Sequence, residues 1–263
     1  MKHTWGQLLK ELSQLQKEHA GRLAAGHEVL PGDPTPFDVL RRKYLEELSA
    51  HTGRATIWYA SAFLENKQQL DAGLLNINLQ DMQGFMEAMS NVKERELDLV
   101  LHSPGGSAEA AESIVEYLGT RFDHIRVIVT VAAMSAATML ALSADEIVMG
   151  AHSQLGPIDP QFTISTPEGP RASPGQAILD QFEMAKQQVK DDSGSIGAWL
   201  PILRSYAPGL LAQCISAREL AERYVSDWLS RFMFQGNPTA PQGPPKLRRG
   251  SRTTHTLSHT GAV

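Results

Sequence analysis

The sequence lacks the features that mark secreted, membrane-spanning and nucleic-acid-binding proteins. Its one cysteine, Cys214, cannot form a disulfide within the chain, so cysteine gives no sign of an oxidising compartment. The net charge is −5, and the absence of a basic excess argues against a dedicated nucleic-acid surface. No signal-peptide run opens the chain, and no stretch reaches the ~18 apolar residues of a membrane span. We expect a cytoplasmic protein with no membrane span and no nucleic-acid partner.

Signatures of cofactor chemistry are also missing from the sequence. No His, Cys, Asp or Glu cluster has metal-ligand spacing, and no Gly-x-x-x-x-Gly-Lys phosphate loop occurs. Asp145 and Glu146 are adjacent on an expected strand, so they would point to opposite faces rather than form an acid pair. Mostly apolar neighbours indicate that Cys214 is a small buried hydrophobe. We therefore predict a protein without a cofactor.

Three regions follow one another along the chain. Residues 1–53 carry two amphipathic helical patterns joined by a proline- and glycine-rich linker, which predicts an N-terminal helical arm. Residues 54–235 have the apolar content of a folded domain. From residue 236 to residue 263, Pro, Gly, Arg, Ser and Thr dominate without apolar periodicity, which is typical of a disordered tail.

Strands and helices alternate through the middle region, which predicts an α/β fold. β-Branched and apolar runs predict strands over residues 55–60, 96–102, 125–131 and 146–149. Helical spacing predicts helices over residues 78–91, 108–121, 135–142 and 176–191, and a further helical region over 199–234. The segment 158–175 is rich in Pro, Thr, Ser and Gly, and we expect a loop there.

Two strand-to-helix junctions carry the candidate chemistry. A strand runs into the turn His102-Ser-Pro-Gly-Gly-Ser107, where glycines allow backbone N–H groups to approach an anion or oxyanion; a tight structural turn is the alternative. Ser135 stands between a buried strand and an Ala-rich helix, an arrangement like a nucleophile elbow, with the Ala136 amide beside it as an oxyanion donor. The alternative for Ser135 is a helix cap.

Taken together, the two junctions resemble the Clp-protease/signal-peptide-peptidase/crotonase superfamily. Within it the segments His102-Ser-Pro-Gly-Gly, Ala133-Met-Ser-Ala, Ala144-Asp-Glu-Ile and Leu155-Gly-Pro-Ile-Asp are similar to the serine dehydrogenase proteinase family. The resemblance implies a repeated ββα superhelix, a peptide or unfolded-protein substrate, and a ring-like homo-oligomer. It also implies that the Gly106 and Ala136 amides bind the oxyanion and that Ser135 is the nucleophile.

A serine hydroxyl needs a base to act as a nucleophile near neutral pH. Clp proteases place a histidine downstream of the serine, but the corresponding segment around Asp159 has none. Signal-peptide-peptidase relatives use a lysine from a later helix, which implies Lys186 as the base, with Lys190 one turn on as the competing choice. A lysine serves only where desolvation lowers its pKa. His152 and His102 are further candidates for the base or for the cleft, although surface or structural roles would also explain them.

One departure from the family pattern bears on activity. Ala137 stands where we expect a glycine after the nucleophile, and its extra methyl group could narrow the site. The favoured hypothesis is a serine endopeptidase with a Ser-Lys mechanism. A catalytically degenerate scaffold or regulatory subunit of the same fold, and a crotonase-like acyl-CoA enzyme, are the alternatives.

Overall fold

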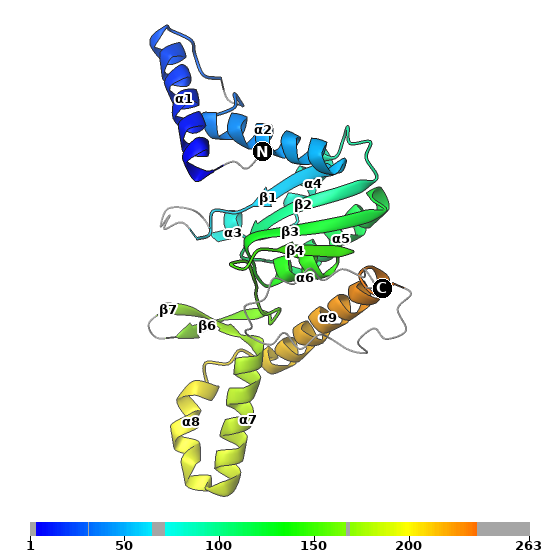
Figure 1. Ribbon diagram of the computed structural model, residues 1–263. Coiled ribbons are helices and arrows are strands. Elements are labelled where there is room, and N and C mark those ends of the chain that lie inside the picture. Colours follow the sequence, from blue (N-terminus) through cyan, green and yellow to red (C-terminus); the bar gives the residue numbers. More distant parts are fainter. Residues whose placement is uncertain (1–3, 31, 65–71, 167–168, 236–263) are drawn as a thin grey trace.

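A parallel β-sheet forms the centre of the computed structural model, which describes residues 4–30, 32–64, 72–166 and 169–235 (Figure 1). The strand order β1-β2-β3-β4 follows the chain, and a short β5 extends the sheet beside the end of β3. The strands are β1 (Ala55–Ala60), β2 (Glu96–Ser103), β3 (His124–Ala133), β4 (Glu146–Met149) and β5 (Gln154–Leu155).

Helices link the successive strands and cover one face of the sheet (Figure 1). They are α3 (Ala72–Leu75), α4 (Asp81–Ala88), α5 (Ala108–Arg121) and α6 (Ala136–Leu142). Leu97, Leu99 and Leu101 alternate along β2 and are fully buried in the main core, as period-two side chains on one face of a strand are expected to be. The strand-helix alternation confirms the α/β fold class.

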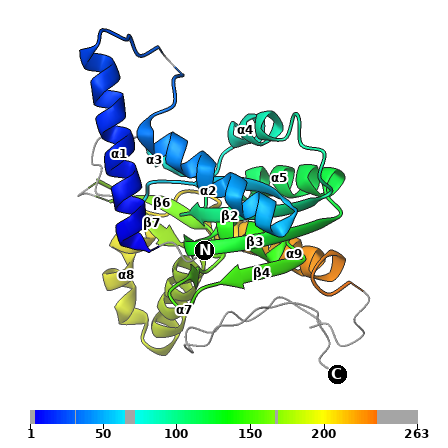
Figure 2. The same ribbon diagram turned by 45° about the horizontal axis from the view of Figure 1, so that its top comes forward.

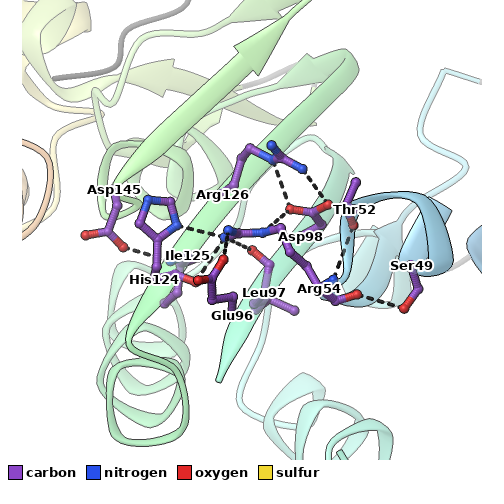
Figure 3. A network of polar contacts seen from close by, with 10 residues as sticks. All are labelled: Ser49, Thr52, Arg54, Glu96, Leu97, Asp98, His124, Ile125, Arg126 and Asp145. Carbon is purple, nitrogen blue, oxygen red and sulfur yellow. Dashed lines mark hydrogen bonds and ion pairs between the residues drawn. The ribbon is translucent and has the colours of Figure 1, made fainter. Parts of the chain in front are cut away.

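A buried ionic network joins β2 and β3 to Arg54, the residue before β1 (Figure 3). It lies toward the amino ends of the strands, whereas the glycine turn 104–106 follows the carboxyl end of β2. The Asp98 carboxylate is fully buried and accepts two hydrogen bonds from the Arg126 guanidinium, at 2.9 and 2.7 Å. Arg54 Nε lies 2.7 Å from an Asp98 oxygen, and the same side chain pairs with Glu96. Ser49 of the N-terminal arm donates to the Arg54 carbonyl at 2.7 Å, which fastens the arm to the sheet.

Two helices form the N-terminal arm. Each begins at a capping box, in which a threonine side chain accepts a hydrogen bond from the backbone N–H of the N3 residue. They are α1 (Trp5–Ala24) and α2 (Pro36–Thr52). Helix α2 lies beside β1, whereas α1 extends away from the sheet (Figures 1 and 2). No residue of either helix is buried, and even the large apolar side chains of Trp5 and Phe37 are at least half exposed. The arm therefore presents apolar surface that the described part of the chain leaves exposed.

Two antiparallel strands occupy most of the segment 158–175, so the expectation of a loop there was wrong. Strands β6 (Gln161–Thr166) and β7 (Gly169–Pro174) pair along their full length. Phe162 and Ile164 alternate with polar residues and pack against a second, smaller core, whose buried residues are Ile178, Leu210 and Cys214. That alternation stabilises the ribbon despite its proline- and glycine-rich composition.

A helical hairpin follows the ribbon and projects away from the sheet (Figure 1). Its elements are α7 (Gly175–Asp191), the short 3₁₀ turn Ser193–Ser195 and α8 (Ile196–Leu203). Helix α8 contains only apolar residues and glycine, yet none of them is buried. The chain then returns to the body of the molecule as α9 (Leu210–Arg231), whose Val225 and Trp228 enter the main core.

Two helical boundaries differ from the expectations, and the tail lies outside the described residues. The helix expected over 78–91 is shorter, because only α4 (Asp81–Ala88) is helical. A turn precedes it, in which the Asn78 side chain accepts a hydrogen bond from the Gln80 N–H at 2.8 Å. The helical region expected over 199–234 is divided at Gly209, which has φ +82°. The proposed tail, residues 236–263, belongs to the part of the chain that is not described.

Candidate active site

Ser135 lies at a strained junction between β3 and α6. Its φ of 50° and ψ of −120° make it the one non-glycine residue with positive φ in the described parts of the chain. It occupies the N-cap position of α6, but its side chain makes no capping hydrogen bond. The helix-cap alternative therefore has no support. Backbone strain of this kind costs about 1–3 kcal/mol and commonly marks a functional serine at a strand-to-helix turn.

The glycine turn after β2 lies directly against Ser135. Gly105 has φ +90°, and a Cβ added to it would be 2.7 Å from Ser135 Cβ and 2.8 Å from the Ala136 nitrogen. A real Cβ would collide at these distances, so only glycine lets the two segments come this close. The structure thus brings together the two junctions that carry the sequence motif.

A single residue clamps the glycine turn from the opposite side. Ile77 donates its N–H to the Gly105 carbonyl at 2.8 Å and accepts the Ser107 N–H at 2.9 Å. In this parallel bridge Ile77 bonds to Gly105 and Ser107, the residues on either side of Gly106. The Gly106 amide therefore faces away from Ile77. Among the residues that the structure describes, neither the Gly106 N–H nor the Ala136 N–H donates to an acceptor. Both amides remain available to a ligand beside Ser135.

Buried hydroxyl groups fix the two turns, and sequence reasoning did not single them out. Ser103 Oγ accepts the Gly105 N–H at 3.1 Å, and the Ser103 carbonyl accepts the Met134 N–H at 3.0 Å. Thr138 Oγ1 donates to the Ala133 carbonyl at 2.7 Å and accepts the Gly156 N–H at 3.1 Å. These bonds hold the backbone around Ser135 without using its own hydroxyl.

A cleft of about 560 Å³ opens over Ser135. The glycine turn and the start of α5 line part of it, and α9 lines another part with Ala217, Leu220 and Ala221. Met139 and Ile158 add apolar surface. The contribution of α9 could not be read from the sequence, because no motif marks it. The cleft is large enough for a side chain next to a bound carbonyl group.

Ala137 does not narrow this cleft. Its side chain is fully buried in the main core, and its N–H donates to the Met134 carbonyl at 2.9 Å. It is not one of the residues that line the cleft. The extra methyl group relative to glycine is thus accommodated behind the site, within the core.

The structure does not bring the candidate lysines to Ser135 within one chain. Lys186 lies on the projecting helix α7, where its Nζ is 3.0 Å from Glu183 and its side chain is 64% exposed. Lys190 is exposed in the last turn of the same helix. Neither residue lines the cleft over Ser135.

The candidate histidines also lie outside this cleft. His102 Nδ1 is 3.2 Å from the Ala132 carbonyl oxygen, and its ring is tilted against Phe63 with the ring centroids 4.9 Å apart. Its side chain lines a separate cleft together with Trp58. His152 is exposed in the turn after β4 and does not line the Ser135 cleft.

A polar junction ties the cleft to α7 and α9. Both oxygens of the Asp159 carboxylate lie 3.2 Å from the Gln176 N–H, at the start of α7. Burial raises the pKa of Asp159, opposed by that backbone hydrogen bond. The Gln176 side chain in turn accepts a hydrogen bond from Arg218 of α9 at 2.7 Å. These hydrogen bonds hold in place the segment 158–161, which lines the cleft with Ile158, Pro160 and Gln161.

Two further findings concern other kinds of site. Within the described ranges, no group of three or more His, Cys, Asp or Glu side chains could hold a metal ion. No helix of the described chain has both the length and the apolar character needed to cross a membrane. Cys214 is fully buried, as its apolar neighbours predict, and burial raises the pKa of its thiol.

Comparison with known proteins confirms the family resemblance over the middle of the chain. Residues 74–196 match the family described as ClpP-like SDH-type serine proteinase. Two uncharacterized proteins of Methanocaldococcus jannaschii are similar: MJ0137 is 40% identical over 87 residues, and MJ1495 is 31% identical over 118 residues. These segments cover 33% and 44% of this chain, but only 30% and 38% of the relatives. The chain therefore spans about a third of the length of the curated relatives it matches.

Several solved structures are distantly similar. A variant of the 1510-N membrane-bound stomatin-specific protease aligns at 18% identity and a TM-score of 0.33, covering 44% of this chain and 58% of that chain. The ClpP protease catalytic domain from Plasmodium falciparum aligns at 15% identity and a TM-score of 0.29, covering 47% and 62%.

Proposed function

We propose that this chain, whose residues 74–196 match the ClpP-like SDH-type serine proteinase family, is a serine peptidase with Ser135 as its nucleophile. The observation that carries the proposal is the strained Ser135 backbone packed against Gly105, next to two backbone amides without acceptors in the described chain. A serine that is held by its backbone, lines a cleft and makes no side-chain capping bond within the described chain has the geometry of an acylating nucleophile.

The reaction proposed is acyl transfer to water in two steps. Ser135 Oγ attacks the carbonyl carbon of a peptide bond while its proton passes to a base, and the Gly106 and Ala136 amides bind the oxygen that becomes negative. Each such donor contributes about 3–4 kcal/mol in measured cases. The tetrahedral intermediate collapses, the amine leaves with the proton, and water then releases the acyl group by the same route. No step of this sequence calls for a cofactor.

The base in this proposal is a lysine of α7, with Lys186 preferred over Lys190. A lysine acts as a base only where desolvation lowers its pKa, and in a single chain Lys186 is exposed and lies outside the cleft. The lysine would therefore come from a second copy of the chain in a ring-like homo-oligomer. The uncovered apolar surface of α8, on the same hairpin, favours such an assembly. A peptide or unfolded-protein substrate and a cytoplasmic location stay predictions.

Covalent labelling with a fluorophosphonate tests the nucleophile. We expect the wild-type protein to be labelled and Ser135→Ala not to be labelled, because Ser135 Oγ displaces fluoride from phosphorus. Ser230→Ala, on the exposed side of α9, is the matched control and should keep full labelling. Equal labelling of wild type and Ser135→Ala would refute the proposal. Absence of labelling in the assembled wild-type protein would favour the alternative of a catalytically degenerate scaffold.

A further inference from the structure

The cleft over Ser135 contains one charged side chain among the described residues that line it. That residue is Glu109, in the first turn of α5. The other polar side chains of the lining are hydroxyls and amides, and the remaining wall is apolar or glycine. The uncharged polar side chains are Asn76, Asn78, Ser107, Ser135 and Gln161.

The Glu109 carboxylate is held in its ionised form by its surroundings. The Ser107 hydroxyl donates to Glu109 Oε2 at 2.7 Å. This hydrogen bond is the main cause that lowers the pKa of Glu109, followed by a hydrogen bond from its own backbone amide. Its place at the start of α5 adds the favourable interaction of a negative charge with a helix N-terminus. The cleft thus holds a fixed negative charge on the same wall as the oxyanion turn.

No cation of the described chain neutralises this charge. Within the described ranges, no arginine, lysine or histidine forms an ion pair with Glu109, and none is a cause of its lowered pKa. Arg218 of α9 does not line the cleft, and its guanidinium donates to the Gln176 side chain at 2.7 Å. Tyr224, further along α9, donates to Glu112 at 2.7 Å rather than to Glu109. A ligand that enters the cleft therefore meets a carboxylate without a positive partner among the described residues.

We propose that Glu109 is a specificity-determining residue that selects peptide substrates with a lysine or arginine side chain close to the scissile bond. The inference rests on the proposed function, because it takes the cleft over Ser135 to be the peptide site. A cationic side chain placed beside Glu109 gains a charge-assisted hydrogen bond, whereas a glutamate there is repelled. The apolar wall from α9 would accommodate the methylene groups of such a side chain.

Peptidyl diphenyl phosphonates test this selection directly, since Ser135 Oγ displaces phenoxide from phosphorus and the rate of labelling can be followed. Three otherwise identical series would carry lysine, norleucine or glutamate at each of the three positions before phosphorus. At the position that faces Glu109, we expect the lysine probe to react roughly fivefold faster than norleucine, and the glutamate probe to react more slowly. Glu109→Gln should equalise the three rates, and Glu109→Lys should favour glutamate.

Controls separate this inference from the proposed function. Glu87→Gln, on the exposed face of α4, should keep the lysine preference of the wild type. Thermal unfolding would establish that each variant is folded. Fluorophosphonate labelling of Ser135 together with equal rates for all three probes would overturn the role of Glu109 and leave the peptidase proposal standing. Persistence of the lysine preference in Glu109→Lys would also overturn it. Loss of all labelling in the wild type would overturn both.

Discussion

At the scale of single residues, the site depends on Gly105 having no side chain. Two features of Gly105 disfavour a side chain: its positive φ and its close contact with Ser135. Substitutions at two different glycines can distinguish their effects. Gly105→Ala incurs roughly 1–2 kcal/mol of backbone strain. Its methyl group would also lie 2.3 Å from the Met134 carbonyl oxygen, which forces the Ser135 turn to move. We expect fluorophosphonate labelling to slow about a hundredfold, because small displacements of a nucleophile have effects of that size.

Gly209 provides the matched control for this prediction. Its φ of +82° is close to that of Gly105, but a methyl group added there would have nothing within 4 Å. Gly209→Ala should incur only the backbone strain of roughly 1–2 kcal/mol, and its labelling should stay at the wild-type rate. If both variants label equally well, the close approach of Gly105 to Ser135 has no functional importance.

Residues of the site differ in how far the sequence could predict them. Ser135, Gly106 and Ala136 belong to short motifs whose geometry is local, so the motif alone indicated where they would lie. Glu109 and Ile77 carry no such pattern, because their position depends on which segments the fold brings alongside the glycine turn. Ala137 shows the opposite case: the motif indicated a change beside the nucleophile, and its side chain points into the core.

At the scale of elements, the ionic network around Asp98 connects the amino ends of β2 and β3 to the start of β1 (Figure 3). Asp98→Ala removes a fully buried carboxylate and leaves Arg54 and Arg126 facing one another without their shared partner. Breaking a buried ion pair in this way costs about 3–5 kcal/mol. We expect the free energy of unfolding in urea to fall by that amount.

The exposed pair of Arg95 and Asp123 is the control for this prediction. Asp123→Ala should change the unfolding midpoint much less, and the change should shrink further in high salt. A similar loss in the two variants would mean that burial of Asp98 adds nothing to the stability of the sheet.

Elements were predicted well where one strong periodicity dominates. The strands over 96–103 and 146–149 and the helix over 108–121 lie where their apolar patterns indicated. The ribbon over 161–174 was missed because its strands offer only Phe162 and Ile164 to a small core, amid residues typical of loops. Pairing with a second strand outweighed that local preference, and it depends on contacts that a single segment does not reveal.

At the scale of the whole molecule, the direction of α7 could not be predicted from the sequence. The family resemblance implies Lys186 as the partner of Ser135, but α7 projects away from the sheet (Figure 1). Lys186 accordingly does not line the cleft over Ser135. The same hairpin holds Ile196 and Leu200 on α8, which are 48% and 41% exposed. Exposed apolar residues on the hairpin that carries the candidate base favour a second copy of the chain as the element that completes the site.

Complementation between two inactive variants tests this arrangement. Ser135→Ala lacks the nucleophile and Lys186→Ala lacks the proposed base, so neither should hydrolyse a peptide on its own. In co-expressed mixed oligomers, an intact Ser135 meets an intact Lys186 across an interface, and we expect peptide hydrolysis to return in part. Co-expression of Ser135→Ala with the double variant should remain inactive, because no Ser135 is present. Sedimentation would first establish that each sample is assembled. Activity of Lys186→Ala alone would exclude that lysine as the base, and an inactive, fully assembled mixture would exclude its supply by a neighbouring copy.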